Sequence, residues 1–315
     1  MSEPSAARLP PFHTLLKSRE VEDPINLWVH RPLAYAFVAL IFRTPVTPNQ
    51  ITVLATFTGL VAAGCWFVGT PTLMVAGGII LWTSAILDGA DGILARAKQM
   101  HSQFGRALDG SMDMVVAIVS VSAAFFHLYL QQRNIWHLIL AVPAIALTLP
   151  HIYLYDFYKE SFLRMTRVGR GGEAEDLAFV KDWAAQLERD KAGFFYRFLV
   201  GNLLMAVVSS ETALVRMLNP AASREGLVFN VTDQTAAIYH KHNCAPMQLW
   251  NAISLAPHTY IMSICGICDR LDIYLWIRLV VMNVIFVTVL IWQRIATRRT
   301  NAELGAAGLG PVAAG

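Results

Sequence analysis

Long uncharged stretches alternate with short polar segments along this chain. No charged residue occurs from Ile51 to Leu87, and only the Gly-Thr-Pro-Thr sequence at 69–72 interrupts the apolar run. A helix needs about 20 apolar residues to cross the hydrocarbon core of a bilayer. Glycine and proline favour a turn at the interruption. The stretch therefore predicts two membrane helices joined by a tight turn.

The same pattern recurs further along the chain. We expect additional membrane helices from Gly105 through Leu130, at about Asn134–Tyr155, at Pro246–Cys268 and at Leu271–Gln293. Pro143 and Pro150 predict bends in the second of these. The hydrophobic pattern thus predicts an all-α polytopic membrane protein with six transmembrane helices and no sheet.

The N-terminal part, residues 1–48, differs from the membrane domain that follows. Residues 1–23 are polar, so no cleavable signal peptide is expected. Pro24–Phe42 predicts a helix with Asp23 as its N-cap. Its apolar run, Leu33–Phe42, is too short to cross a membrane. Because basic residues flank that run, we expect an interfacial helix lying on the cytoplasmic membrane surface.

A polar insertion at about 156–245 interrupts the membrane domain, which we expect at 49–300. It opens with charges of both signs, a turn at Gly169–Gly172 and an amphipathic helix at Glu173–Lys191. Phe194–Leu218 is more apolar, but its uncharged part is short. We interpret it as a helix buried against the bundle or lying at the interface, with a seventh span as the alternative. Residues 219–245 predict irregular loop, and the Ala/Gly-rich tail at 301–315 predicts disorder.

Composition and charge agree with an integral membrane protein. The 315 residues are 55% hydrophobic and only 15% charged, against about 25% charged in soluble domains. The net charge of +3 is too small to indicate a nucleic-acid partner. Lysine and arginine concentrate near both termini and in the insertion, while the turns at 69–72, 131–134 and 269–270 hold few. This distribution predicts both termini in the cytoplasm.

Four aspartates stand where two of the predicted membrane helices meet. Asp88 and Asp91 share one helical face, and Asp109 and Asp113 share a face of the next helix. Carboxylates brought this close repel one another unless a cation lies between them. Hard divalent cations such as Mg²⁺ prefer oxygen ligands, and paired metals are used in phosphoryl chemistry. The pattern predicts a metal site.

This stretch resembles the signature of the CDP-alcohol phosphotransferase family, an Asp-x-x-Asp-Gly-x-x-Ala-Arg half followed after eight or nine residues by Gly-x-x-x-Asp-x-x-x-Asp. It matches at every fixed position: Asp88, Asp91, Gly92, Ala95, Arg96, Gly105, Asp109 and Asp113. Pro48, Asn49 and Thr52 match a Pro-Asn-x-x-Thr sequence that is common in the family.

The resemblance implies an enzyme that transfers the phosphoalcohol group of a CDP-alcohol to an acceptor hydroxyl and releases CMP. It implies Asp88, Asp91 and Asp109 as metal ligands for two Mg²⁺ or Mn²⁺ ions, and Asp113 as the base and a further ligand. Gly92, Ala95, Arg96 and Gly105 would surround the CDP group, with Asn49 and Thr52 holding the donor phosphates. A homodimer is also implied.

Several alternatives stay open. The donor is either CDP-diacylglycerol or a soluble CDP-alcohol, with an alcohol or lipid acceptor accordingly. A non-enzymatic cation-binding membrane protein or transporter is the competing interpretation, although acids at helix ends on one side disfavour transport. His151, His258 and Arg278 could line an acceptor pocket or be buried structural groups. His240, His242 and Cys244 are weak metal candidates, and Cys265 and Cys268 are either buried thiols or a disulfide.

Overall fold

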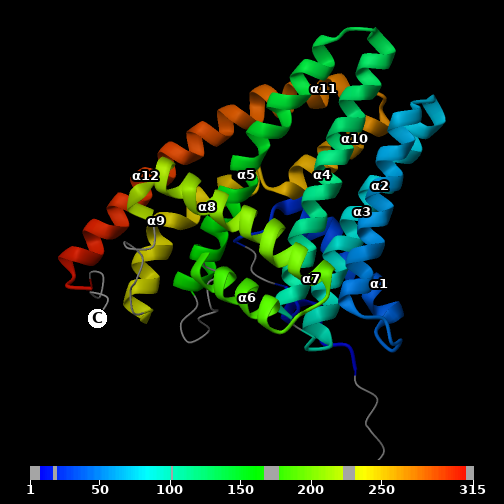
Figure 1. Cartoon of the computed structure of the whole chain (residues 1–315). Coiled ribbons are helices and arrows are strands. Elements are labelled where there is room, and N and C mark those ends of the chain that lie inside the picture. Colours follow the sequence, from blue (N-terminus) through cyan, green and yellow to red (C-terminus); the bar gives the residue numbers. More distant parts are fainter. Residues whose placement is uncertain (1–7, 17–19, 101, 167–176, 223–230, 310–315) are drawn as a thin grey trace, which may run out of the picture. The chain divides into compact units, whose positions relative to one another are not determined.

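The computed structural model describes the chain except for residues 1–7, 17–19, 101, 167–176, 223–230 and 310–315. The described residues form helices and no strand, so the all-α prediction is confirmed (Figure 1). The predicted turn at Gly169–Gly172 lies outside the described residues. The α-helices in chain order are α1 (Arg31–Ile41), α2 (Pro48–Val68), α3 (Pro71–Ala97), α4 (Gln103–Gln132), α5 (Trp136–Thr166), α6 (Leu177–Arg189), α7 (Phe194–Phe198), α8 (Met205–Leu218), α9 (Asp233–Asn251), α10 (Leu255–Ile267), α11 (Leu271–Trp276) and α12 (Met282–Ala306).

Shorter helical segments connect some of these helices. The 3₁₀ segments are η1 (Phe12–Thr14) and η4 (Pro220–Ala222), and the π-helical segments are η2 (Asn26–His30), η3 (Leu199–Leu204) and η6 (Ile277–Val281). The chain divides into two compact units. Unit 1 comprises Met1–Ala141 and Thr259–Asp272, and unit 2 comprises Val142–His258 and Ile273–Gly315.

Six of the described helices are long and apolar enough to cross a membrane: Pro48–Val68, Pro71–Ala97, Ala107–Gln132, Trp136–Thr166, Tyr196–Leu218 and Leu271–Ala306. The protein is therefore an all-α polytopic membrane protein. Five of these coincide with predicted spans. The remaining one, Tyr196–Leu218, is the segment that we expected to be buried or interfacial, so its length and composition favour the alternative interpretation.

Three sequence predictions are wrong in the C-terminal part. Pro246–Cys268 is not one continuous helix, because α9 ends at Asn251 and α10 begins at Leu255. Pro257 has no N–H to donate to a carbonyl one turn earlier, which explains the break. The predicted loop at 219–245 contains most of α9, which starts at a capping box between Thr232 and Thr235. The predicted disordered tail is helical to Ala306, and Leu304 is fully buried.

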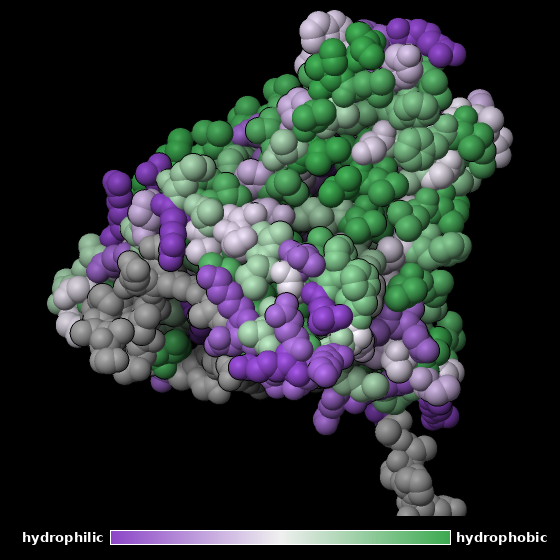
Figure 2. Space-filling view, in the orientation of Figure 1, coloured by the Kyte–Doolittle hydropathy of each residue, from purple (hydrophilic) through white to green (hydrophobic). Residues whose placement is uncertain are grey.

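Within unit 1, α2, α3 and α4 pack together, and α1 packs against α3. The turn between α2 and α3 places Gly69 at φ 72°, in the left-handed region that glycine adopts without strain. Figure 2 shows that the outer surface over these helices is mostly apolar, and exposed side chains such as Phe57 and Val68 contribute to it. A lipid-facing surface has this character.

The N-terminal helix matches its prediction closely. The carboxyl oxygen Oδ1 of Asp23 accepts a hydrogen bond from the Asn26 backbone N–H at 2.9 Å. Trp28 of η2 and Leu33 and Leu40 of α1 are exposed, and the location of this helix on a membrane surface stays a prediction. His30 points inward, and burial lowers its pKa to about 4. The ring is therefore neutral at pH 7.

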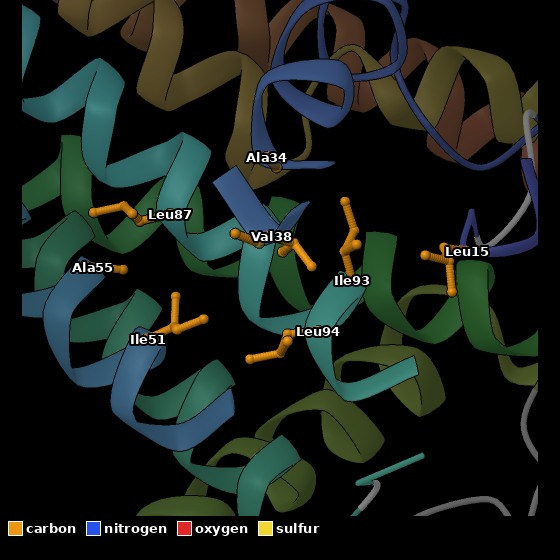
Figure 3. Packing of buried hydrophobic residues seen from close by; sticks show 9 residues of the cluster. Leu15, Ala34, Val38, Ile51, Ala55, Leu87, Ile93 and Leu94 are labelled. Carbon is orange, nitrogen blue, oxygen red and sulfur yellow. The ribbon is translucent and has the colours of Figure 1, made fainter. Parts of the chain in front are cut away.

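The opposite face of α1 contributes to a hydrophobic cluster that supports the aspartate-bearing helix. Figure 3 shows side chains from the N-terminal segment, α1, α2 and α3 meeting there: Leu15, Ala34, Val38, Ile51, Ala55, Leu87, Ile93 and Leu94. All are at least 90% buried. This packing fixes the end of α3 against α1 and α2, and so positions the residues that follow Leu87.

Candidate active site

The four aspartates gather where α3 ends and α4 begins. Asp88 and Asp91 lie near the end of α3, and Asp109 and Asp113 lie in the first turns of α4. Carboxylate oxygens of Asp88, Asp91 and Asp109 all lie within 4.8 Å of one another. The Asp113 side chain is within hydrogen-bonding reach of Asp88. The chain thus brings all four carboxylates together, as the spacing along the sequence predicts.

Helix α2 holds α3 in place beside this cluster. Asp91 is 6% exposed, and its Oδ2 accepts a hydrogen bond from the Thr52 Oγ1 hydroxyl at 2.5 Å. Thr52 is itself buried. Two turns earlier in α3, the Ser84 hydroxyl donates to the Ala55 carbonyl of α2 at 2.7 Å. These hydrogen bonds between α2 and α3 orient the Asp91 carboxylate before any ligand arrives.

A cleft of about 420 Å³ opens beside the aspartates. Its lining residues are Pro48, Asn49, Thr52, Asp91, Gly92, Ala95, Met100, Ser102, Gly105 and Asp109. A Cβ atom at Gly105 would approach the Ser102 Oγ to 2.9 Å and the Asn49 Oδ1 to 3.0 Å, so a larger residue would crowd this wall. The volume suits a small-molecule ligand.

Most of the residues predicted to surround the CDP group lie on this cleft. Asn49, Thr52, Gly92, Ala95 and Gly105 all line it. Arg96 instead turns away along α3, and its Nε donates to the Leu15 carbonyl at 2.5 Å. Its guanidinium lies against Gly92, because a Cβ there would be 3.5 Å from the Arg96 Nη1. Arg96 therefore borders the cleft wall from the protein side.

Two residues that line the cleft were not predicted from the sequence. Met100 and Ser102 lie in the short connection between α3 and α4. The Ser102 hydroxyl accepts a hydrogen bond from the Gly105 backbone N–H at 2.9 Å, which makes Ser102 the N-cap of α4. A serine three residues before a motif glycine is a recognisable helix-start signal. Nothing in the sequence singles out Met100.

The other candidate residues are found elsewhere. Within unit 2, His151, His258 and Arg278 form a buried cluster with Tyr274 and Asn283. His242 is not in a loop but on α9, where its Nε2 lies 2.6 Å from the Glu303 Oε2. Cys265 is buried, Cys268 is exposed, and both are free thiols. None of these residues lines the cleft.

The aspartate cluster fits a metal centre by the chemistry of its donors. Three carboxylates offer only oxygen ligands, which Mg²⁺ and Mn²⁺ prefer over nitrogen or sulfur. Their spacing of under 4.8 Å suits oxygens that share bound ions. A cation would relieve the repulsion among them.

The family model of CDP-alcohol phosphatidyltransferase matches residues 45–172. This part of the chain is similar to the domain that the family model describes. It contains α2, α3, α4 and all four aspartates. The match begins just before the α2 residues Pro48, Asn49 and Thr52, so the cleft and the carboxylate cluster described above both lie within the matched region.

Curated relatives are similar to part of this chain. A bifunctional IPC transferase and DIPP synthase of Aquifex aeolicus is 40% identical over 82 residues, 26% of this chain and 18% of its own. A phosphatidylinositol phosphate synthase of Mycobacteroides abscessus is 36% identical over 101 residues, 32% of this chain and 41% of its own. An archaetidylinositol phosphate synthase of Pyrococcus horikoshii is 40% identical over 68 residues, 22% and 35% respectively. The chain thus covers less than half of each relative.

Proposed function

We propose that the protein is a CDP-alcohol phosphotransferase of lipid or polyol-phosphodiester synthesis. One observation carries the proposal: the family signature brings three carboxylates within 4.8 Å of one another on the wall of a cleft of about 420 Å³. In the reaction, the acceptor hydroxyl oxygen forms a bond to the phosphorus that carries the alcohol. The bond from that phosphorus to the CMP oxygen breaks, and CMP leaves.

Each site residue has a role that its position supports. Asp113, one turn deeper in α4 than Asp109, takes the proton of the attacking hydroxyl. Asn49, Thr52, Gly92, Ala95 and Gly105 hold the donor along the cleft. Arg96, whose guanidinium lies against Gly92 at the cleft wall, contacts the donor phosphates. Gly92 and Ala95 allow the nucleotide to approach the backbone closely.

Asp88, Asp91, Asp109 and Asp113 would hold two Mg²⁺ or Mn²⁺ ions. Such ions, when bound, neutralise charge that develops on the diphosphate. The carboxylates set the positions of these ions, and Thr52 fixes one of the carboxylates through its hydrogen bond to Asp91. The non-enzymatic alternative gains no support from a signature that extends beyond the acids to Gly92, Ala95, Arg96 and Gly105.

The relatives suggest which substrates to test first. Two are named as phosphatidylinositol phosphate and archaetidylinositol phosphate synthases, names that join a lipid group to inositol phosphate. We propose that this protein uses a lipid CDP-alcohol such as CDP-diacylglycerol as donor and a polyol phosphate as acceptor. The second candidate pairs a soluble CDP-alcohol with a lipid acceptor.

Purified protein in detergent with Mg²⁺ would decide between these. We would incubate it with CDP-diacylglycerol or a soluble CDP-alcohol, each with and without inositol phosphate or another polyol phosphate, and measure CMP and the lipid product. CMP release that needs both a donor and an acceptor supports the proposal. Absence of CMP release from every pair would contradict it.

We further propose a bacterial inner-membrane protein whose cleft opens to the cytoplasm, where nucleotides are available, and which functions as a homodimer. Basic residues near both termini support the orientation. Mass measurement in mild detergent and in lipid nanodiscs tests the dimer, since a monomer mass in both would contradict it.

A further inference from the structure

A short segment ahead of α1, which we call the N-terminal strap (Leu9–Leu15), packs against the site helix. Leu15 is 3% exposed and belongs to the hydrophobic cluster with Val38 and Leu94 (Figure 3). The strap is separated from α3 by more than fifty residues of sequence, yet its last side chain is buried among those of α3. The strap is therefore a packed part of unit 1.

Helix α1 holds the other end of the strap. The Tyr35 hydroxyl donates to the Pro10 carbonyl at 3.1 Å. The Tyr35 and Phe12 rings meet edge to face with centroids 5.3 Å apart. Such ring pairs stabilise a packed segment beyond the area that they bury. Tyr35 and the Leu15 side chain thus fix both ends of the strap, and with them the direction of its backbone carbonyls.

One of those carbonyls reaches the candidate site. The Leu15 carbonyl accepts a hydrogen bond from the Arg96 Nε at 2.5 Å. The Arg96 Nη2 is buried and has no hydrogen-bond partner within the described part of the chain. The Nη1 and Nη2 atoms lie 3.5 Å and 3.7 Å from where a Cβ of Gly92 would be, and Gly92 lines the cleft.

We propose that Leu15 is a positioning residue for the donor, acting through Arg96. Its carbonyl fixes the guanidinium through Nε and leaves Nη1 and Nη2 beside Gly92, where they can bind the diphosphate of a cytidine nucleotide in two-pronged fashion. Fixing a flexible side chain in advance saves part of the entropy cost of binding. This inference rests on the proposed function.

Two variants weaken the strap without touching the cleft. Leu15→Ala removes its buried anchor, and Tyr35→Phe removes only the hydroxyl that holds Pro10. With CDP as the probe and Mg²⁺ present, isothermal titration in detergent should give a Kd about 3- to 10-fold higher for Leu15→Ala. Tyr35→Phe should shift the Kd in the same direction by about 2- to 3-fold. The KM for the donor should rise while kcat at saturating donor stays unchanged.

A matched control separates positioning from general destabilisation. Leu81→Ala removes a buried leucine from the same helix α3, outside the cluster that contains Leu15, and should leave the Kd for CDP unchanged. The decisive measurement is a double-mutant cycle. In an Arg96→Ala background, Leu15→Ala should weaken CDP binding no further, because the strap acts only through Arg96.

Several outcomes would overturn the inference. Equal weakening by Leu15→Ala with and without Arg96 would give the strap a purely structural role. An unchanged Kd for CDP in Leu15→Ala would also refute the inference. Tighter CDP binding with faster turnover in Leu15→Ala would refute it too, because the strap would then be inhibitory. Those results leave the proposed function intact, whereas wild-type protein that neither binds CDP nor releases CMP overturns both.

Discussion

Four aspartates of the same chemical type occupy different surroundings, and the differences suggest a division of labour. Asp91 is buried and receives the Thr52 hydroxyl, so its carboxylate is held in one orientation. Asp113 stands one helical turn beyond Asp109 in α4, and its side chain lies beside that of Asp88. These differences motivate a test of the proposed roles, in which all four aspartates hold metal ions and Asp113 also accepts the proton.

Substitutions that keep the shape of the side chain test that division. Asp113→Asn should retain CDP and metal binding but slow CMP release by about 10²- to 10⁴-fold, because the amide cannot accept the proton. Asp88→Asn should instead weaken metal binding and, with it, CDP-alcohol binding. Both variants would be assayed for CDP binding and CMP release in the same detergent. Normal turnover in Asp113→Asn, or loss of nucleotide binding as complete as in Asp88→Asn, would contradict the assignment.

Thr52 offers a second test at the same scale. Thr52→Val keeps the volume but removes the hydroxyl that orients Asp91, so Mn²⁺ affinity should fall by about 10-fold or more. Thr52→Ser keeps a hydroxyl and should restore most of it. Electron paramagnetic resonance of Mn²⁺ titrated into the protein measures the affinity without activity. Identical Mn²⁺ affinities in Thr52→Val and wild type would show that the hydrogen bond does not position a ligand.

Metal removal is the simplest test of the carboxylate cluster. CMP release should stop in excess chelator and return when Mg²⁺ or Mn²⁺ is added back, since four neighbouring carboxylates otherwise repel an incoming diphosphate. Readdition of Ca²⁺, which favours longer and less regular coordination, provides a comparison. Full activity in excess chelator would refute the metal assignment.

The sequence largely predicted which residues form the candidate site, but it did not predict which residues hydrogen-bond to them. Local spacing places Asp88, Asp91, Asp109 and Asp113 on facing turns of two helices joined by a short connection. By contrast, the partners of Thr52 and Arg96 are set by tertiary packing between segments far apart in sequence. The Leu15 carbonyl carries no sequence signal, because every residue has a backbone carbonyl.

At the scale of whole helices, prediction succeeded where capping residues and apolar length agree. Thr47 and Gln50 form the capping box that starts α2, and Gly69 ends it. It failed at α9, whose apolar and polar residues alternate without a long run. A helix of mixed polarity is stabilised by packing, and α9 packs along α12. The sequence of α9 alone does not show that partner.

Unit 2 contains a buried arginine that ties several helices together. The Arg278 Nε donates to the Ala144 carbonyl of α5 at 3.1 Å, and its Nη1 donates to the Tyr274 hydroxyl of α11. Nη1 also lies 3.4 Å from the His258 Nδ1 of α10. Among the described residues, the Arg278 side chain bonds to a carbonyl, an imidazole and a hydroxyl. An arginine in an apolar segment therefore depends on carbonyl, hydroxyl and imidazole acceptors.

Replacing Arg278 should destabilise the protein without affecting the cleft. Arg278→Ala leaves buried polar groups of three helices without their donor, at about 1–3 kcal/mol each. The apparent melting temperature in detergent should fall by about 5 °C or more. Arg278→Lys cannot reach all three acceptors and should recover only part of this. CDP affinity at low temperature should not change, and a CDP-binding defect as large as that of Arg96→Ala would place Arg278 in the site instead.

For the whole molecule, the open question is which helices cross the membrane. Basic residues near both termini favour an even number of crossings. Four spans, α2 to α5, and the long C-terminal helix Leu271–Ala306 make five, so only one of Tyr196–Leu218 and the α10 region can cross. Length and composition favour Tyr196–Leu218, whereas α10 is short and follows a break.

Contacts inside unit 2 favour the opposite choice. At the end of α8, the Asn219 Nδ2 donates to the Tyr158 hydroxyl at 2.9 Å and to the Thr297 Oγ1 at 3.1 Å. Close by, the Asn301 Nδ2 donates to the Ala221 carbonyl at 3.3 Å. Tyr158 lies towards the end of α5 from which the chain enters the insertion, and Asn301 lies near the arginine-rich end of α12. The end of α8 is thus on the same side as the start of the insertion.

Tyr196–Leu218 should therefore begin and end on the cytoplasmic side, and the chain should cross at α10. Single cysteines in a cysteine-free background, labelled with a membrane-impermeant maleimide in sealed vesicles, test this. Exposed sites just before the helix and in its last turn, Gly193→Cys and Arg216→Cys, should label together with Arg299→Cys at the C-terminal end. Gln131→Cys and Arg270→Cys, in the opposite loops, should label only from the other side. If Arg216→Cys labels from the same side as Gln131→Cys, Tyr196–Leu218 crosses the membrane. The contacts of Asn219 with Tyr158 and Thr297 could not then exist in the membrane, and the topology argued here would be wrong.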